Sequence, residues 1–261
     1  MTIIITGGSG FVGTALIKAL LTKQKSSKIV ILDLTPPKIE LQDLVHFVYT
    51  DITDREAVLR AFQAFQDIEC VFHVAGFGLA GTANLPAFNG KTRNVNVGGT
   101  RNIIDACIQC NAKALGMYFQ CIYLKEFQSY SNFFFAVFTS TVNVVFAGQE
   151  ILNGTEESHL WLEKGHLDFY SDTKHQAEKL VIEASSSPKL KTCVLRLGGV
   201  YGPGEQTILG RSLKLMSTKL GFLSFCHRPD LKIDFLHIDN AVQGHFKVRN
   251  KIESFILFNA R

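Results

Sequence analysis

The stretch TGGSGFVG, from Thr6 to Gly13, constrains this chain more than any other. An apolar run precedes it and a helical pattern of apolar residues follows, which places the glycines in a turn between a strand and a helix. Gly7 allows the tight turn, Gly10 lets a pyrophosphate approach the backbone, and Gly13 lets the helix pack close to the strand. We expect the helix start to face phosphates, with a ligand-free loop as the alternative. The candidate cofactor contacts in this turn are Gly7, Gly10, Phe11, Val12 and Gly13.

An aspartate marks the end of the second expected strand. Asp33 follows the run KIVIL and stands 20 residues after Gly13. A carboxylate at this place accepts hydrogen bonds from the adenosine ribose hydroxyls and repels a 2′-phosphate. Because no arginine follows Asp33 closely, the sequence favours NAD over NADP; a solvated turn aspartate is the alternative.

Two later strand ends add candidates for the cofactor site. Asp51 and Ile52 follow a strand at 45–49 and are placed to meet adenine, although Asp51 or Thr53 could instead cap the next helix. Ala75 ends an apolar strand at 70–75, where backbone would lie against the cofactor. In the same strand we interpret His73 as a hydrogen-bonded core histidine rather than a ligand or base.

Strands alternate with helices along the chain. Further strands are expected to end at residues 139–141 and to run over 193–196, with a helix from about 94 to 110 and another around 169–181. This alternation predicts an α/β fold with a parallel, doubly wound sheet of the Rossmann type.

A tyrosine and a lysine carry the expected chemistry. Tyr170 and Lys174 are four residues apart on one expected helix and therefore share a face. A nearby ammonium favours the phenolate, so Tyr170 could act as a base near neutral pH while Lys174 also binds the nicotinamide ribose. Thr141, at a strand end, could donate to a substrate oxygen. The alternative is an ordinary solvated Tyr and Lys.

Composition excludes several classes of protein. The net charge of +4 comes without a basic cluster, which argues against nucleic acid. No run of 18 apolar residues predicts a membrane span, and no signal peptide precedes the first strand, so we expect an intracellular, cytoplasmic chain. The six cysteines are interpreted as reduced thiols. Cys107 and Cys110 lack a second pair, and no metal site is predicted.

Taken together, these residues resemble the extended short-chain dehydrogenase/reductases. The stretches TSTVNVVF at 139–146 and VYGPGEQ at 200–206, with HIDN at 237–240, resemble the 3β-hydroxysteroid dehydrogenase/isomerase branch, and most of all its family 42E members. The resemblance implies NAD-dependent oxidation of the CH–OH of a steroid-like alcohol, a possible homodimer, and in many relatives a C-terminal membrane anchor that this chain lacks. It also implies that Asn96 shapes the active site through a bound water, and that Ser140 could take the role of Thr141.

One position departs from that branch. Arg196 is followed by Leu197, where the branch has a proline that packs beside the nicotinamide. Two other functions stay open: a nucleotide-sugar epimerase or dehydratase of the same extended family, and a non-catalytic dinucleotide-binding protein.

The expected domain organisation contains two unusual segments. Residues 1–196 are assigned to the dinucleotide-binding domain and 197–247 to part of a substrate-binding region. Residues 116–136 exceed the length that a helix, loop and strand need. Their ends, GMY and FFFAV, can be encoded by splice-donor and acceptor sequences, so we interpret them as a translated intron, with a lineage-specific insertion as the alternative. KVR at 247–249 can likewise encode a donor, which makes 248–261 a candidate aberrant tail of a truncated gene model.

Overall fold

The computed structural model describes residues 1–23, 27–110, 134–155, 162, 164–187, 189–207, 209–217 and 234–259. Its centre is a six-stranded sheet in the order β3-β2-β1-β4-β5-β6, in which every described pairing is parallel. The strands are β1 Thr2–Thr6, β2 Lys28–Asp33, β3 His46–Tyr49, β4 Ile68–His73, β5 Phe134–Thr141 and β6 Leu190–Leu197. This order reverses direction between β1 and β4, as in a doubly wound sheet, and confirms the predicted fold class.

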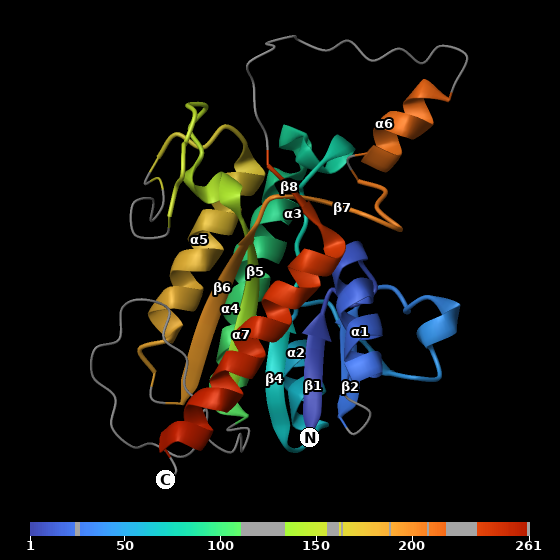
Figure 1. Ribbon diagram of the computed structural model, residues 1–261, viewed down its shortest axis with the longest axis vertical. Helices are drawn as coiled ribbons and strands as arrows, with labels where there is room; N and C mark the ends of the chain where they lie inside the picture. The colour runs from blue at the N-terminus through green and yellow to red at the C-terminus, as the bar shows by residue number, and fades with distance from the viewer. Residues whose placement is uncertain are drawn as a thin grey trace.

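Helices cover both faces of the sheet (Figure 1). One face carries α1 (Phe11–Lys23) and α7 (Ile238–Asn259), which pack against each other. The other face carries α2 (Arg55–Gln63), α4 (Thr100–Gln109) and α5 (Phe169–Ala184). The shorter elements are η1 Ile39–Leu41, η2 Gly81–Asn84, η3 Pro86–Phe88, α3 Asn89–Arg93, η4 Asn94–Gly99, η5 Val142–Val145 and α6 Leu209–Met216. A separate parallel pair joins β7 (Gly199–Tyr201) to β8 (Phe235–His237).

The apolar run in β1 shows why this strand lies at the centre. Ile3 and Ile5 point to one face and pack with Leu16 and Leu20 of α1, whereas Ile4 points to the other face. None of the three isoleucines is exposed to solvent. A strand buried on both faces needs apolar side chains at every position, which is what the continuous run supplies.

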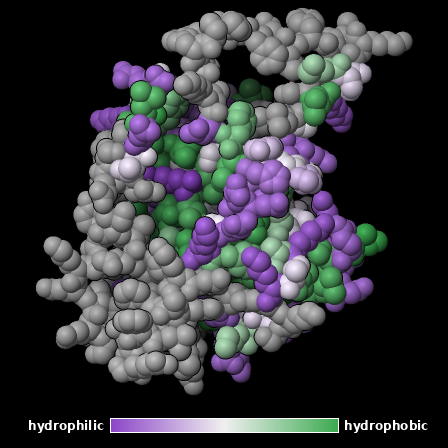
Figure 2. Space-filling model, in the orientation of Figure 1, coloured by the Kyte–Doolittle hydropathy of each residue, from purple (hydrophilic) through white to green (hydrophobic). Residues whose placement is uncertain are grey.

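Helix α7 is amphipathic over the part whose side chains are described. Ile238, Ala241, Val242, His245 and Phe246 are buried against the sheet face, and Asp239, Asn240, Gln243 and Lys247 are exposed. Figure 2 shows this exposed side as a diagonal hydrophilic band over the position that α7 has in Figure 1. The candidate aberrant tail begins inside this helix, and Val248 packs partly buried against the core. Within the described part of the chain, none of the helices has the length and apolar character needed to cross a membrane.

Strand β5 contains the last residues of the segment 116–136. Residues 114–133, including most of that segment and the start of the expected spliced strand, lie outside the described residues. Phe134 and Ala136, however, pair with Leu190 and Thr192 of β6, so these last residues of the segment are part of the sheet. Phe135 and Ala136 are buried, because a central parallel strand accepts a continuous apolar run of this kind.

Candidate functional site

The glycine turn after β1 has the predicted geometry. Gly7 has φ of +69°, and a Cβ there would lie 2.7 Å from the backbone N and Cα of Ala75. A Cβ on Gly13 would lie 2.3 Å from the Gly7 carbonyl oxygen. On Gly10, a Cβ would meet only that same oxygen, at 3.3 Å. Side chains are therefore excluded at the first two positions by neighbouring backbone, whereas Gly10 leaves the turn open.

Asp33 is joined directly to this turn. Its Oδ2 accepts a hydrogen bond from the Ser9 backbone N–H at 3.0 Å, and its Oδ1 accepts from the N–H and hydroxyl of Thr35. The structure thus brings the predicted ribose-binding carboxylate beside the predicted phosphate-binding turn.

The residues after β3 differ from expectation in which of them caps α2. Asp51 Oδ1 accepts from the N–H and hydroxyl of Thr53, while the N-cap of α2 is Asp54, which accepts from the Ala57 N–H at 3.0 Å. Neither residue considered as a cap is therefore the cap. The Ile52 side chain packs in the core on Gly99, where a Cβ would lie 2.5 Å from Ile52 Cδ1, and its expected contact with adenine stays a prediction.

A chain of hydrogen bonds runs through His73, as its interpretation as a core histidine predicts. Thr100 donates to the Asn96 carbonyl at 2.6 Å, so its oxygen accepts from His73 Nε2 at 2.9 Å. Nδ1 then accepts from the Thr6 hydroxyl at 2.6 Å, and Thr6 in turn accepts from the Ala75 N–H. Burial, with the charge of Lys174 as a smaller cause, lowers the pKa of His73 to about 3. The ring is therefore neutral and holds Ala75 and Asn96 in place.

Asn96 joins the loop after β4 to α5. Its side chain accepts from the Phe77 N–H at 2.8 Å and donates to the Phe77 carbonyl at 2.9 Å and to the Thr173 hydroxyl at 2.9 Å. Asn96 lies in η4, a turn of π-helix, a form that often occurs at functional sites. These bonds position the backbone of the loop and the start of α5. The action of Asn96 through a bound water, which the resemblance implies, stays a prediction.

Lys174 points from α5 to the carboxyl end of β5. Its Nζ donates to the Thr139 carbonyl at 2.6 Å and lies 4.1 Å from the centroid of the Phe138 ring. A Cβ on Gly76 would lie 3.9 Å from this Nζ and 3.5 Å from Asn96 Oδ1. The side chains of Lys174 and Asn96 therefore both lie next to Gly76, in the loop after β4. Burial lowers the pKa of Lys174 to about 7, although Glu178 acts in the opposite direction.

Tyr170 lies one turn earlier on α5, in a different electrostatic setting from the one expected. Burial raises the pKa of its phenol well above the ordinary value, and the Asp168 carboxylate raises it further. Among the described contacts, no hydrogen bond joins Tyr170 to Lys174, whose ammonium is engaged by a backbone carbonyl. The expected lowering of the phenol pKa by Lys174 is therefore absent from this arrangement, because the lysine turns toward β5.

Glu178 is a site residue that the motif analysis missed. It is buried, accepts from the Ser140 hydroxyl at 2.7 Å and pairs with Arg196 of β6, whose Nε lies 3.0 Å from Oε1. It also lies four residues after Lys174 on α5 and raises the pKa of that lysine. This spacing, which repeats the interval between Tyr170 and Lys174, is the signal that could have identified it.

The bond from Ser140 to Glu178 bears on the choice between Ser140 and Thr141. The Ser140 hydroxyl is already directed at a buried carboxylate, whereas Thr141 closes β5 and its oxygen accepts only a 3.3 Å bond from the Asn143 N–H. Thr141 therefore stays the better candidate to donate to a substrate. Leu197, where the resemblance expects proline, ends β6 directly opposite Thr141.

Comparison with known proteins places the chain in a family. A family model matches residues 3–259. The chain belongs to the NAD dependent epimerase/dehydratase family. Members of this family are extended short-chain dehydrogenase/reductases, so the resemblance seen in the motifs is confirmed, as is NAD as the cofactor.

Three known proteins illustrate what this chain is similar to in sequence or structure. The chain is 36% identical over 251 residues to "Short-chain dehydrogenase/reductase family 42E member 1" of Macaca fascicularis, covering 94% of this chain and 57% of the relative. It is 31% identical to "Sterol-4-alpha-carboxylate 3-dehydrogenase erg26, decarboxylating" of Schizosaccharomyces pombe, covering 97% and 66%. The solved Thermus thermophilus UDP-glucose 4-epimerase in complex with NAD superposes with a TM-score of 0.68 at 24% identity, covering 94% and 73%. The chain thus spans little more than half of the length of the first relative.

The residues present fit the cofactor of this family. Gly7, Asp33, Asp51, Ala75 and Thr141 all lie at or just after the carboxyl ends of parallel strands, at one edge of the sheet. The order reverses between β1 and β4, where α/β sheets bind dinucleotides. The open position at Gly10 and the Asp33 carboxylate would hold the phosphate and adenosine end, and the spot near Gly76 and Lys174 would hold the nicotinamide end.

Proposed function

We propose that this chain is an NAD-dependent oxidoreductase of the 3β-hydroxysteroid dehydrogenase type, which oxidises the CH–OH group of a steroid-like alcohol. The observation that carries the proposal is the pairing of Tyr170 and Lys174 on one face of α5, with the Lys174 ammonium held 2.6 Å from the Thr139 carbonyl at the edge where the cofactor binds. The names of two similar proteins, a family 42E dehydrogenase/reductase and a sterol carboxylate 3-dehydrogenase, support a sterol-like substrate.

Each polar group has a role in this reaction. Bound NAD supplies the acceptor for the hydride that leaves the carbinol carbon. Tyr170 takes the proton of the substrate hydroxyl, which leaves a ketone, and Thr141 orients the oxygen by donating to it. Lys174 must turn toward the phenol to stabilise its charge, because burial alone raises the Tyr170 pKa. Asn96 and Glu178 position the loop after β4 and the lysine.

The 261-residue chain, with only part of a substrate-binding region, is expected to be poorly active. The test therefore follows NADH absorbance while the full-length protein translated from the verified transcript is offered a 3β-hydroxysteroid or a UDP-sugar. We expect turnover of the steroid and at least a roughly hundredfold loss of kcat in Tyr170→Phe, because general-base catalysis contributes about 10²–10⁴-fold. Tyr49→Phe is the matched control, since Tyr49 is exposed on β3. Turnover of the UDP-sugar alone would favour an epimerase or dehydratase. NAD binding with no turnover, or turnover unaffected by Tyr170→Phe, would contradict the proposed chemistry.

The domain organisation forms part of the same proposal. Residues 1–196 hold the cofactor, residues 197–247 contribute to the substrate-binding region, and 116–136 and 248–261 derive from unspliced or misassigned sequence. Sequencing transcripts across codons 115–139 and 247–250 tests the last two points. Transcripts that consistently contain both segments would contradict them.

A further inference from the structure

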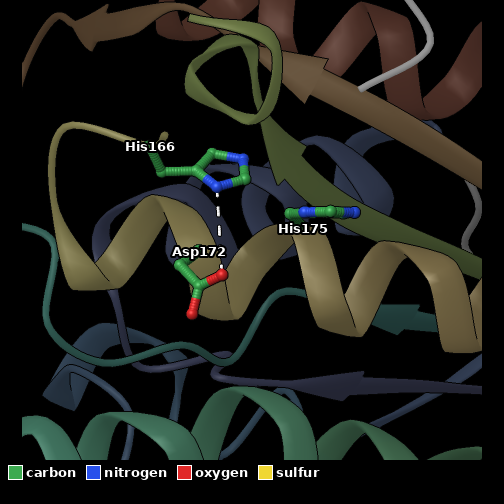
Figure 3. Close-up of side chains that lie close together, drawn as sticks. All are labelled: His166, Asp172 and His175. Carbon is green, nitrogen blue, oxygen red and sulfur yellow. Dashed lines mark ion pairs between the residues drawn. The ribbon is translucent and has the colours of Figure 1, made fainter. Parts of the chain in front are cut away.

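Three side chains gather where α5 begins, on a part of the helix that the proposed chemistry does not use (Figure 3). His166 comes from the segment before α5, Asp172 from its first turn and His175 from the next turn. One ligand atom from each lies within 4.8 Å of the other two, and the two imidazole rings lie 5.0 Å apart between centroids. Asp172 and His175 are three residues apart on the helix, which places them on one face.

The hydrogen bond of His166 determines which ring nitrogen carries its proton. Nε2 lies 3.1 Å from the Val144 carbonyl oxygen, which can only accept, so Nε2 is the donor. In the neutral ring Nδ1 then bears a lone pair, and this atom faces Asp172 Oδ1 at 3.8 Å. Protonation of Nδ1 would make this contact an ion pair, and a metal cation bound between the two atoms would take the place of that proton. A backbone carbonyl that fixes the tautomer of a histidine is also the usual outer partner of a metal ligand.

The carboxylate is held in a matching orientation. Gln176 donates from Nε2 to Asp172 Oδ2 at 2.8 Å, which leaves Oδ1 directed toward His166. Gln176 is itself held by Arg93, whose Nη1 donates to its Oε1 at 3.2 Å. The His166 side chain is 3% exposed and that of Asp172 is 35% exposed, so the cluster is closed on one side and open to solvent on the other.

We propose that His166, Asp172 and His175 form a binding site for a divalent transition-metal cation of the Zn²⁺ class. Two imidazoles and one carboxylate suit Zn²⁺, which binds such ligands at about 2.0–2.2 Å and keeps a further position for water. In a tetrahedral site with these bonds, ligand atoms are about 3.3 Å apart, so binding draws the ligand atoms together by about 0.5 Å for His166 and Asp172 and by at most about 1.5 Å for the other pairs. The metal fastens the segment before α5 to the helix that carries Tyr170. No sequence motif indicates this site, because His166 lies outside the helix and its spacing from His175 along the chain matches no common metal motif.

The test measures metal binding by the full 261-residue chain. The metal-free protein is titrated with Zn²⁺ in competition with a chromophoric chelator, and Co²⁺ is used in parallel for its visible spectrum. We expect one equivalent bound at roughly micromolar affinity or tighter. Gln176→Leu removes an outer partner of the site and should weaken Zn²⁺ binding roughly 10–100-fold. His166→Gln and His175→Gln remove ligands and should weaken Zn²⁺ binding by more than this. A saturating excess of Zn²⁺ should raise the Tm of the wild-type chain by several degrees.

Two further variants separate this site from non-specific binding and from misfolding. Asp172→Asn should also lose Zn²⁺ affinity. The asparagine can still accept the hydrogen bond from Gln176, and the position is partly exposed, so a collapsed core would not explain this loss. His237→Gln is the matched control, because His237 Nδ1 lies 3.5 Å from Asp239 Oδ2 without a third ligand among the described residues, and it should bind Zn²⁺ normally. Failure to bind one equivalent would overturn the proposal, and so would undiminished binding by His166→Gln, His175→Gln and Asp172→Asn, which would assign the metal to other groups such as the thiols.

Discussion

Glu178→Gln tests whether the buried carboxylate on α5 holds the site together. In the wild-type chain the side chains of Glu178 and Arg196 are 2% and 16% exposed, and Ser140 donates to the same carboxylate. Removing one partner of a buried ion pair costs about 3–5 kcal/mol because the other charge stays behind. The partial exposure of Arg196 places the expected loss at the lower end, about 3 kcal/mol. In a chain of this length that corresponds to a Tm about 6–12 °C lower.

The assay is urea denaturation of the wild type, Glu178→Gln, Arg196→Met and the double variant. The double variant should regain part of the lost free energy of unfolding, since it leaves no unpaired charge. Glu183→Gln, at an exposed position of the same helix, should stay within about 0.5 kcal/mol of the wild type. Because Glu178 raises the pKa of Lys174, Glu178→Gln should also lower that pKa further. A free energy of unfolding equal to that of Glu183→Gln would refute the reasoning.

Two further predictions concern the glycine turn and the buried lysine. Gly13→Ala places a Cβ 2.3 Å from the Gly7 carbonyl oxygen and should destabilise the chain by about 1–3 kcal/mol and weaken NAD binding in calorimetry. Gly244→Ala, in α7 with no atom within 4 Å of the added Cβ, should instead stabilise it by about 0.5–1 kcal/mol, and equal effects of the two substitutions would contradict the packing argument. Burial lowers the pKa of Lys174 to about 7, so the folded chain binds fewer protons than the unfolded chain between that pH and the ordinary lysine pKa of 10.5. Wild-type stability should therefore rise with pH across this window relative to Lys174→Met, and parallel pH profiles would show that Lys174 titrates normally.

Much of the fold follows from local patterns in the chain. Continuous apolar runs such as that of β1 suit strands buried on both faces, and glycines spaced as in the turn after it suit a strand that feeds a helix. The link between Asp33 and the turn could be predicted for the same reason, because both lie at strand ends of one parallel sheet. These features depend on spacing of a few residues, which the sequence shows directly.

The direction of individual side chains could not be predicted in the same way. The spacing of Tyr170 and Lys174 places both on one face of α5, but only packing shows that the lysine turns to the Thr139 carbonyl. The sequence likewise does not show that the Ile52 side chain packs on Gly99, 47 residues later in the chain. His166 lies near Asp172 while the Val144 carbonyl holds the other side of its ring. Each of these outcomes depends on partners distant in sequence.

In the series of hydrogen bonds through His73, only one assignment of donors and acceptors is possible. The series begins at the Ala75 N–H and ends at the Asn96 carbonyl. The strand that precedes the glycine turn and the helix that supports the loop after β4 are therefore fastened through a ring that stays neutral at physiological pH. The two ends of a bound dinucleotide would accordingly meet a single rigid platform. Any motion that admits the cofactor must then come from the outer segments, since a hinge between these two elements would have to break a buried hydrogen bond of the His73 ring.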